Sequence, residues 1–168
     1  MVLGYTYPDN GGFEVIANMM PEEEAIAGGF PTHLETDNRM VVPVGVPIRL
    51  QTTGADVIHS FGIPSLWFKI DAVPGRINER MLTITEPGIY YGQCMELCGA
   101  RHGYMPISIE ARPQAEFDAW VRSRGGQTHA EVEAEAAAAA APAPVEAAPA
   151  AADVEPAATE TAAAVPAA

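Results

Sequence analysis

Two thiols, an imidazole and a thioether fall within one short stretch of this 168-residue chain: Cys94, Cys98, His102 and Met105. Sulfur and imidazole donors of this kind suit copper. One cysteine, two histidines and a weak axial methionine are the ligands of a blue-copper electron-transfer centre. Cys98, His102 and Met105 supply three of those four ligands. The second imidazole must therefore come from elsewhere in the chain.

His59 is the best candidate for that imidazole. It lies in the apolar, strand-like run Asp56–Phe61, where an unpaired imidazole would be costly to bury. His33 and His129 have polar, loop-like surroundings. We therefore expect His59 to join the cysteine-containing loop.

Cys94 is not explained by a mononuclear blue-copper site. It precedes Cys98 by four residues, an offset that can point both sulfurs inward in a tight loop. A thiolate has enough lone pairs to bridge two metals, so two bridging thiolates would hold two copper ions close together. Each ion would then be completed by one histidine and one weaker donor, and a backbone carbonyl of the loop can serve as one of these weaker donors.

Three other interpretations compete with a copper centre. A disulfide between Cys94 and Cys98 is geometrically possible in an exported protein, but it leaves His102 and Met105 without a role. Structural zinc normally has four Cys or His ligands, with shorter cysteine spacing, and has little use for methionine. Simple core filling explains one buried Cys or Met rather than this set. The spacing favours copper, and two ions over one.

The elements that must position these residues are short strands. Seven runs rich in β-branched and aromatic residues are separated by Gly, Pro and Asp: Phe13–Ala17, Met40–Val44, Ile48–Thr53, Val57–Ile63, Met81–Thr85, Ile89–Gly92 and Ile107–Ala111. Such spacing predicts an all-β sandwich or barrel. One short helix is predicted after Pro113, because Phe117, Trp120 and Val121 share one face. Residues 20–32 are expected to form a loop or a single acidic turn.

The chain divides into a domain over residues 1–126 and a tail over residues 127–168. Residues 129–168 contain 21 alanines and five prolines but no Phe, Trp, Tyr, Leu or Ile. Alanine favours helix, and Glu131–Ala141 has helical propensity, but the prolines limit its extension. We expect a disordered acidic tail.

The net charge of the chain limits the classes of molecule that it is expected to bind. The chain has 22 acidic and 9 basic residues and a net charge of −13. This excess disfavours nucleic acid and favours cationic partners. No membrane-spanning run or signal peptide is recognisable, which predicts a soluble chain.

The ligand loop also resembles a known family. Cys94-x-Glu96-x-Cys98-x-x-x-His102-x-x-Met105-Pro106, after Tyr90-Tyr91-Gly92-Gln93, is similar to the binuclear copper A loop of cytochrome c oxidase subunit II. The segments around Asp56–Leu66, Asp71–Arg76, Thr36–Arg39 and Tyr5–Asp9 resemble the same family, over roughly residues 4–122.

This resemblance implies a cupredoxin-like Greek-key β-barrel with a mixed-valence dicopper centre. By the family pattern, Cys94 and Cys98 bridge both ions. His59 and Met105 complete one ion, and His102 with the Glu96 carbonyl completes the other. The implied function is to accept electrons from cytochrome c and pass them to haem in subunit I. On this interpretation the isolated domain is an electron carrier that makes no product.

The family pattern carries further expectations. The Glu96 carboxylate helps to bind magnesium at the contact with subunit I, in the intact complex only, and Asp37 and Asp56 match acids that dock cytochrome c. Family members carry membrane helices ahead of this domain, which faces the periplasm. This chain begins at Met1 without them, so we expect a truncated, soluble fragment. Trp67 stands where a small residue is expected.

Two rival functions stay open at this stage. The copper A domain of a nitrous oxide reductase shares the cysteines, histidine and methionine, although Glu96 and the Asp71–Arg76 segment favour the oxidase. In a copper-chaperone or thiol-redox domain, Cys94 and Cys98 would cycle between dithiol and disulfide. His102 and Met105 at fixed offsets disfavour that interpretation.

Overall fold

The structure is a computed structural model, and it describes residues 3–140. Within that range the chain forms nine strands: β1 (Leu3–Tyr7), β2 (Phe13–Ala17), β3 (Met40–Pro43), β4 (Ile48–Thr52), β5 (His59–Ile63), β6 (Phe68–Ala72), β7 (Asn78–Leu82), β8 (Gly88–Cys94) and β9 (Pro106–Arg112). Its helices are α1 (Glu22–Gly28), α2 (Gln114–Ser123) and α3 (His129–Ala140), with short 3-10 turns η1 (Pro8–Asn10), η2 (Pro64–Leu66) and η3 (His102–Tyr104).

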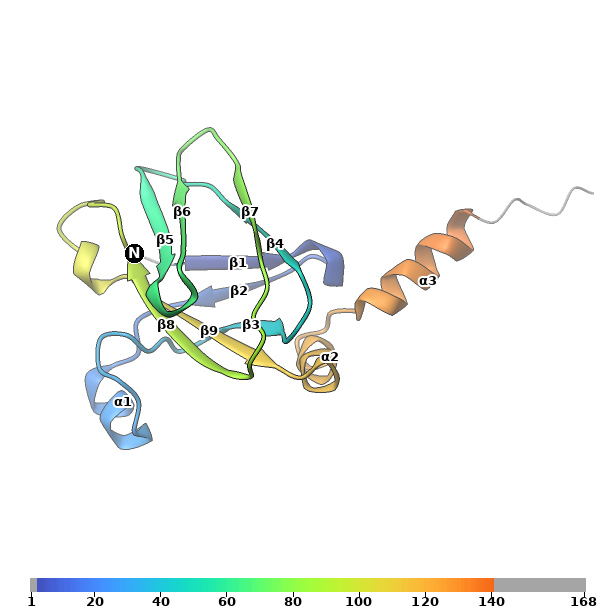
Figure 1. Ribbon diagram of the computed structural model, residues 1–168, viewed down its shortest axis with the longest axis horizontal. Helices are drawn as coiled ribbons and strands as arrows, with labels where there is room; N and C mark the ends of the chain where they lie inside the picture. Colours follow the sequence, from blue (N-terminus) through green and yellow to red (C-terminus); the bar gives the residue numbers. More distant parts are fainter. Residues whose placement is uncertain (1–2, 141–168) are drawn as a thin grey trace, which may run out of the picture.

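The strands form three sheets around one core (Figure 1). The largest has the order β3-β9-β8-β5-β6, with β3 and β9 parallel and the other pairs antiparallel. The β1–β2 hairpin and the β4–β7 pair form two smaller antiparallel sheets. Residues from all three sheets meet in one buried cluster that includes Tyr5, Leu50 and Ile109. The predicted all-β sandwich is therefore confirmed.

The predicted helix is present as α2, and it begins directly after Pro113. Its buried residues are Phe117, Trp120 and Val121, the three that the sequence places on one face. They pack with Val15 and Val41 on the outside of the main core. Helix α2 therefore closes one side of the domain.

Two strands, β6 and β1, were not predicted from the sequence, and a third, β7, begins before its predicted position. β6 alternates buried Phe68 and Ile70 with exposed Lys69, a period of two that its charged residues disguise. β1 also escaped prediction. β7 covers Asn78–Leu82, three residues before the predicted Met81–Thr85, because it pairs with β4 through Asn78 and Glu79 as well.

The acidic segment near residue 22 is a helix, not the expected loop or single turn. Its three glutamates all lie in the first turn of α1, where negative charge is favourable at the positive end of the helix dipole. Gly29 ends the helix at φ 72° and donates its N–H to the Ile26 carbonyl. A left-handed glycine is a common helix terminator, so both helix ends have a sequence signal.

The first part of the predicted disordered tail also differs from expectation, because residues 129–140 form helix α3. Thr128 and Glu131 make a capping box: the Glu131 N–H donates to Thr128 Oγ1 at 3.3 Å, and the Thr128 N–H donates to Glu131 Oε2 at 2.7 Å. Glu131 also pairs with Arg122 at 3.0 Å. This anchored start lets the alanine run propagate as a helix that projects from the strands (Figure 1).

The remainder of the predicted tail, residues 141–168, lies outside the described residues. Within the described range, no helix has the length and apolar character needed to span a membrane.

A buried ion-pair network lies on the outer side of β8 and β9. Glu35 is 1% exposed and accepts hydrogen bonds from Arg39 at 2.7 Å and from the Tyr91 hydroxyl at 2.7 Å. Arg39 also reaches Glu110 at 3.2 Å, and Arg112 pairs with Glu110 at 2.9 Å. The network joins the segment before β3 to strands β8 and β9.

Candidate metal centre

The ligand loop joins two neighbouring strands, β8 and β9, and its ends are held together. The Cys94 N–H donates to the Met105 carbonyl at 3.0 Å, so the loop closes on one backbone hydrogen bond. Inside the loop, the His102 N–H donates to the Gly99 carbonyl at 3.1 Å. Gln93 Nε2 donates to the Gly103 carbonyl at 2.7 Å. The backbone therefore fixes where the side chains between Cys94 and Met105 can lie.

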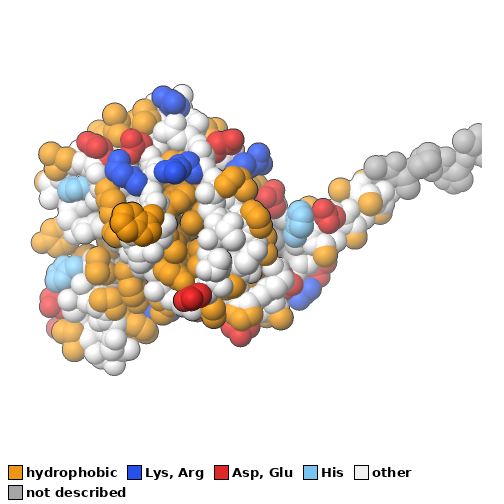
Figure 2. All heavy atoms as spheres, in the orientation of Figure 1, with side chains coloured by type: hydrophobic (Ala, Val, Ile, Leu, Met, Phe, Trp, Pro, Cys, Tyr) orange, Lys and Arg blue, Asp and Glu red, His pale blue; other side chains and the backbone are white. Residues whose placement is uncertain are grey.

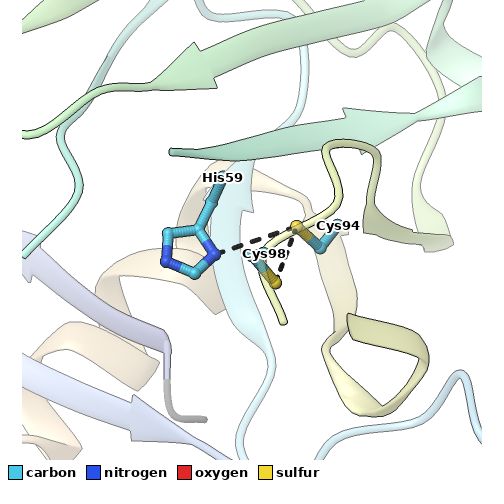
Figure 3. Close-up of side chains that lie close together, drawn as sticks. All are labelled: His59, Cys94 and Cys98. Atoms are coloured by element: carbon cyan, nitrogen blue, oxygen red, sulfur yellow. Dashed lines mark hydrogen bonds between the residues drawn. The ribbon is translucent and has the colours of Figure 1, made fainter. Parts of the chain in front are cut away.

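His59 and the two cysteines converge, as Figure 3 shows. Cys94 Sγ lies 3.9 Å from Cys98 Sγ and 3.9 Å from His59 Nδ1. His59 comes from the start of β5 and Cys94 from the end of β8, two strands that pair in the main sheet. His59 and Cys94 are buried, and Cys98 is partly buried. The structure thus places the imidazole of His59 beside the cysteine loop.

The other loop residues lie on two sides of this cluster. His102 Nδ1 is 3.6 Å from Cys98 Sγ, and the Glu96 carbonyl oxygen is 3.2 Å from Cys94 Sγ. Met105 is 7% exposed and lines a cavity of about 240 Å³ together with His59 and Cys94. Every donor predicted from the sequence is therefore within or beside one cluster.

The donor chemistry fits copper. Two thiols, two imidazole Nδ1 atoms, a thioether and a carbonyl oxygen combine the soft and intermediate donors that copper prefers. Burial, followed by the hydrogen bond with Cys94, raises the pKa of the Cys98 thiol above its ordinary value. A thiolate in this place needs a positive charge to stabilise it, which a bound metal ion supplies.

Asp56 has a local role that the sequence did not reveal. Its carboxylate oxygen lies 2.8 Å from His59 Nε2. The hydrogen bond with His59, followed by the one from the Val57 N–H, lowers the pKa of Asp56. An imidazole that donates through Nε2 carries its lone pair on Nδ1, the atom that faces Cys94. The one feature of the sequence that could have indicated this contact is the Asp-x-x-His spacing from Asp56 to His59.

Asp37, the other predicted docking acid, also forms hydrogen bonds with a residue of this chain. Its carboxylate accepts hydrogen bonds from the backbone N–H of Asn18 at 2.7 Å and from Asn18 Nδ2 at 3.0 Å. Burial acts to raise the pKa of Asp37, but these hydrogen bonds outweigh it and the pKa is lowered. Asp37 therefore ties the segment after β2 to the segment before β3, and it remains exposed.

Two substitutions of Asp56 distinguish the effect of its charge from the effect of its hydrogen bond with His59. Asp56→Ala removes the acceptor that orients His59, and we expect copper affinity to fall about 10- to 100-fold, as for other partners of metal-bound histidines. Asp56→Asn keeps an acceptor oxygen and loses only the charge, so copper affinity should stay near that of the parent. Competition titrations against a copper chelator measure both values. Equal losses in the two variants would contradict the orienting role.

A β-sandwich that carries sulfur and imidazole donors on the loop between two adjacent strands is a cupredoxin-like domain. The solved structures agree. The periplasmic domain of subunit II of cytochrome oxidase from Bradyrhizobium japonicum matches with a TM-score of 0.67 at 47% identity, over 73% of this chain and 84% of that one. A mixed disulfide between a thioredoxin-like protein and subunit II of cytochrome c oxidase matches with a TM-score of 0.61 at 46% identity, over 72% of this chain and 81% of that one.

Residues 2–112 match the family described as cytochrome c oxidase subunit II, periplasmic domain. The chain belongs to this family. A probable cytochrome c oxidase subunit 2 of Rickettsia conorii is 48% identical over 123 residues, which cover 71% of this chain and 38% of the relative. Cytochrome c oxidase subunit 2 of Mycosarcoma maydis is 49% identical over 116 residues, which cover 69% of this chain and 45% of the relative. This chain thus spans less than half of these curated relatives.

Proposed function

We propose that this chain is an electron-transfer domain with a binuclear copper centre. In this function it accepts electrons from cytochrome c or a similar donor and passes them to haem in subunit I of an oxidase. The observation that carries the proposal is the convergence of His59, Cys94 and Cys98, with His102 within 3.6 Å of a cysteine sulfur. The family found is that of the oxidase, which favours this function over a nitrous oxide reductase.

The residues divide into bridging and terminal donors. We assign Cys94 and Cys98 to the bridge because their sulfurs are neighbours and each faces a different histidine. His59 and Met105 share one cavity and would complete one position, while His102 and the Glu96 carbonyl would complete the other. Two copper ions bridged in this way would share one unpaired electron and exchange one electron with little change in geometry.

The protein's contribution is to hold these donors in place and to limit water. His59, Cys94 and Met105 are buried, and the closed loop restrains the donors between Cys94 and Met105. Donors that are already in position need little rearrangement when the centre changes its charge. The rigid hairpin β8–β9 and the neighbouring strand β5 therefore serve the electron transfer by positioning the ligands.

The surface beside the centre suits a cationic electron donor. A shallow depression is lined by Cys98 and by apolar Val57, Ile58 and Leu97, and the acids Asp56 and Glu96 also line it. Acidic groups around an apolar contact steer a basic protein and make its association salt-dependent. We propose a docking role for Asp56 on this ground. For Asp37, which does not line this depression, the proposed docking role rests on the family pattern alone. The exposed Glu96 carboxylate is free to contribute to a magnesium site that subunit I would complete.

Low-temperature electron paramagnetic resonance of the copper-loaded protein tests the proposed function. We expect two copper ions per chain and a hyperfine pattern from one electron shared over two equivalent copper nuclei. A single-nucleus pattern, or retention of one copper ion only, would contradict the binuclear assignment.

A second function of the same cysteines has its own support. A relative at 46% identity was solved as a mixed disulfide with a thioredoxin-like protein. In this chain Cys94 Sγ and Cys98 Sγ are 3.9 Å apart, so only a short movement separates them from a disulfide. Exchange with a small-molecule disulfide would form it, and that disulfide would take up the two electrons and two protons and leave as two thiols. We propose that the metal-free domain is a substrate of a thioredoxin-like reductase, whose thiolate attacks this disulfide and whose second thiol releases the reduced domain.

Thiol counting before and after copper loading tests this second function. The oxidised metal-free chain should show no reactive thiol until a thioredoxin-like reductase and its electron donor are added, and then two. Copper binding should follow reduction. Full copper uptake by the oxidised chain without any reductant would contradict the need for the reductase.

A further inference from the structure

The end of β5 that carries His59 has few contacts with the strand that carries Cys94. In the described part of the chain, β5 and β8 pair at two positions only, and the pairing ends at Phe61, opposite Cys94. On its other side, β5 pairs with β6 along its whole length, from His59 to Ile63. The position of His59 relative to the cysteines therefore depends on what fixes this end of β5 to β6 and to the ligand loop.

Ser60, the residue after His59, makes both of those links. It is 1% exposed in a strand whose five residues are all buried, and a buried hydroxyl is costly without a partner. Its Oγ donates to Asp71 Oδ1 at 2.8 Å, across the β5–β6 pair. Its carbonyl oxygen accepts the N–H of Met95, the residue after Cys94, at 2.9 Å. One residue thus joins the strand that carries His59 to β6 and to the ligand loop.

Asp71 is fixed in turn by further hydrogen bonds. Its Oδ1 also accepts from Lys69 Nζ at 2.7 Å. Its backbone carbonyl accepts from Thr52 Oγ1 on β4 at 2.9 Å and from Asn78 Nδ2 on β7 at 2.7 Å. The hydrogen bond from Lys69, followed by the one from Ser60, lowers the pKa of Asp71. Asp71 is therefore a carboxylate at neutral pH that connects β6 with β4, β5 and β7.

The outer side of Asp71 faces solvent. Its side chain is 48% exposed and that of Lys69 is 49% exposed. Figure 2 shows acidic and basic side chains mixed on the face that β6 and β7 present. An exposed ion pair contributes little to stability. The contact that distinguishes Asp71 from an ordinary surface carboxylate is therefore the inner one, to the buried hydroxyl of Ser60.

We propose that Asp71 is a positioning residue for the candidate metal centre, and that it acts through Ser60 on the distance between His59 and Cys94. This inference rests on the function proposed above, because it concerns the donors of the copper centre. Metal ligands depend on the groups that hold them in place. Loss of the Asp71 acceptor leaves the Ser60 hydroxyl buried and unpaired, so the end of β5 loses its fixed place beside the ligand loop.

Amide hydrogen exchange of the metal-free chain tests the positioning without copper. The Met95 N–H should exchange about tenfold faster in Asp71→Ala and in Ser60→Ala than in the parent, the effect of one hydrogen bond of ordinary strength. Asp71→Asn keeps an oxygen acceptor for the hydroxyl and should restore the exchange rate. Ser108→Ala is the matched control, because Ser108 is a fully buried serine of β9 whose hydroxyl bonds with Thr36.

Copper affinity is the second readout, measured by competition with a chelator. Asp71→Ala and Ser60→Ala should each bind copper about tenfold less tightly, the lower end of the effect seen for partners of metal ligands. The double variant should lose no more than either single variant, because Asp71 acts through Ser60. Lys69→Gln removes only the exposed ion pair, so it should stay near the parent, as should Ser108→Ala.

Three results would overturn the inference. One is a Met95 exchange rate in Asp71→Ala that matches the parent. Another is an equal rise at Val44, whose N–H donates to the Arg112 carbonyl after β3, at the opposite edge of the main sheet from β6, since general destabilisation affects both amides. The third is an additive loss of copper affinity in the double variant. A parent that bound no copper, with the exchange rates as expected, would contradict the proposed function and still support the positioning of His59 by Asp71.

Discussion

Replacing Cys94 with serine is expected to abolish the binuclear centre. A serine hydroxyl is a poor bridging ligand for copper compared with a thiolate. Loss of the Cys94 thiolate leaves Cys98, the two histidines and Met105 as the ligand set of a mononuclear site. Copper content should fall from two ions per chain to one or fewer. The electron paramagnetic resonance pattern should change from one shared over two copper nuclei to one from a single nucleus.

Met95→Leu is the control for that experiment. Met95 follows Cys94 directly, and its side chain packs over Gly62 on the outside of β5, away from the sulfur cluster. A volume-conserving change there should keep both copper ions. A Cys94→Ser variant that retained the parent spectrum would refute the bridging role of Cys94.

Replacing Arg39 with alanine is expected to destabilise the domain by about 3–5 kcal/mol, because it leaves a buried carboxylate without its cation. Glu35 has no exposed side-chain surface in its pair with Arg39. Urea unfolding of the metal-free chain at pH 7 measures the loss. Arg49→Ala is the matched control: Arg49 is exposed and has no carboxylate partner among the described residues, so its loss should stay within about 0.5 kcal/mol.

The pH dependence of the Arg39→Ala variant has a definite sign. In the parent, burial acts to raise the pKa of Glu35, but hydrogen bonds from Arg39, Tyr91 and the Thr36 N–H outweigh it and lower the pKa. This stabilisation is present above the ordinary glutamate pKa and is lost as the pH falls through the lower folded value. Without Arg39, burial should raise the pKa, so stability would be lost as the pH rises. The difference between variant and parent should therefore grow from pH 4.5 to pH 7, and a constant difference would contradict a charge effect.

The ligand loop is open to prediction from sequence because its chemistry is local. Cys94, Cys98, His102 and Met105 lie on one loop between two strands, so residue type and spacing alone indicate a shared site. Recruitment of His59 required a tertiary contact, yet the cost of burying an imidazole in an apolar run pointed to it. What spacing could not give is which nitrogen of His59 faces the sulfur, because Asp56 decides that through a hydrogen bond.

Errors in the predicted fold arise where local signals compete. β6 alternates correctly, but Lys69 and Asp71 mask the apolar residues between them. Helix α1 was missed because its acidic first turn looked like a solvated loop, although charge at that end favours a helix. Residues 129–140 were expected to be disordered for want of core residues, and the Thr128–Glu131 capping box outweighed that absence locally.

The closed ligand loop makes the segment that we propose to bind copper a self-contained unit. It begins and ends on a backbone hydrogen bond between Cys94 and Met105, so we expect a change of sequence between those points to leave the register of β8 and β9 unchanged. Only His59 must come from the host sheet. Another β-sandwich could therefore acquire this chemistry by exchange of one hairpin loop, provided that its adjacent strand offers a histidine at the matching position. Natural variation and engineering alike could retune the donors without rebuilding the scaffold.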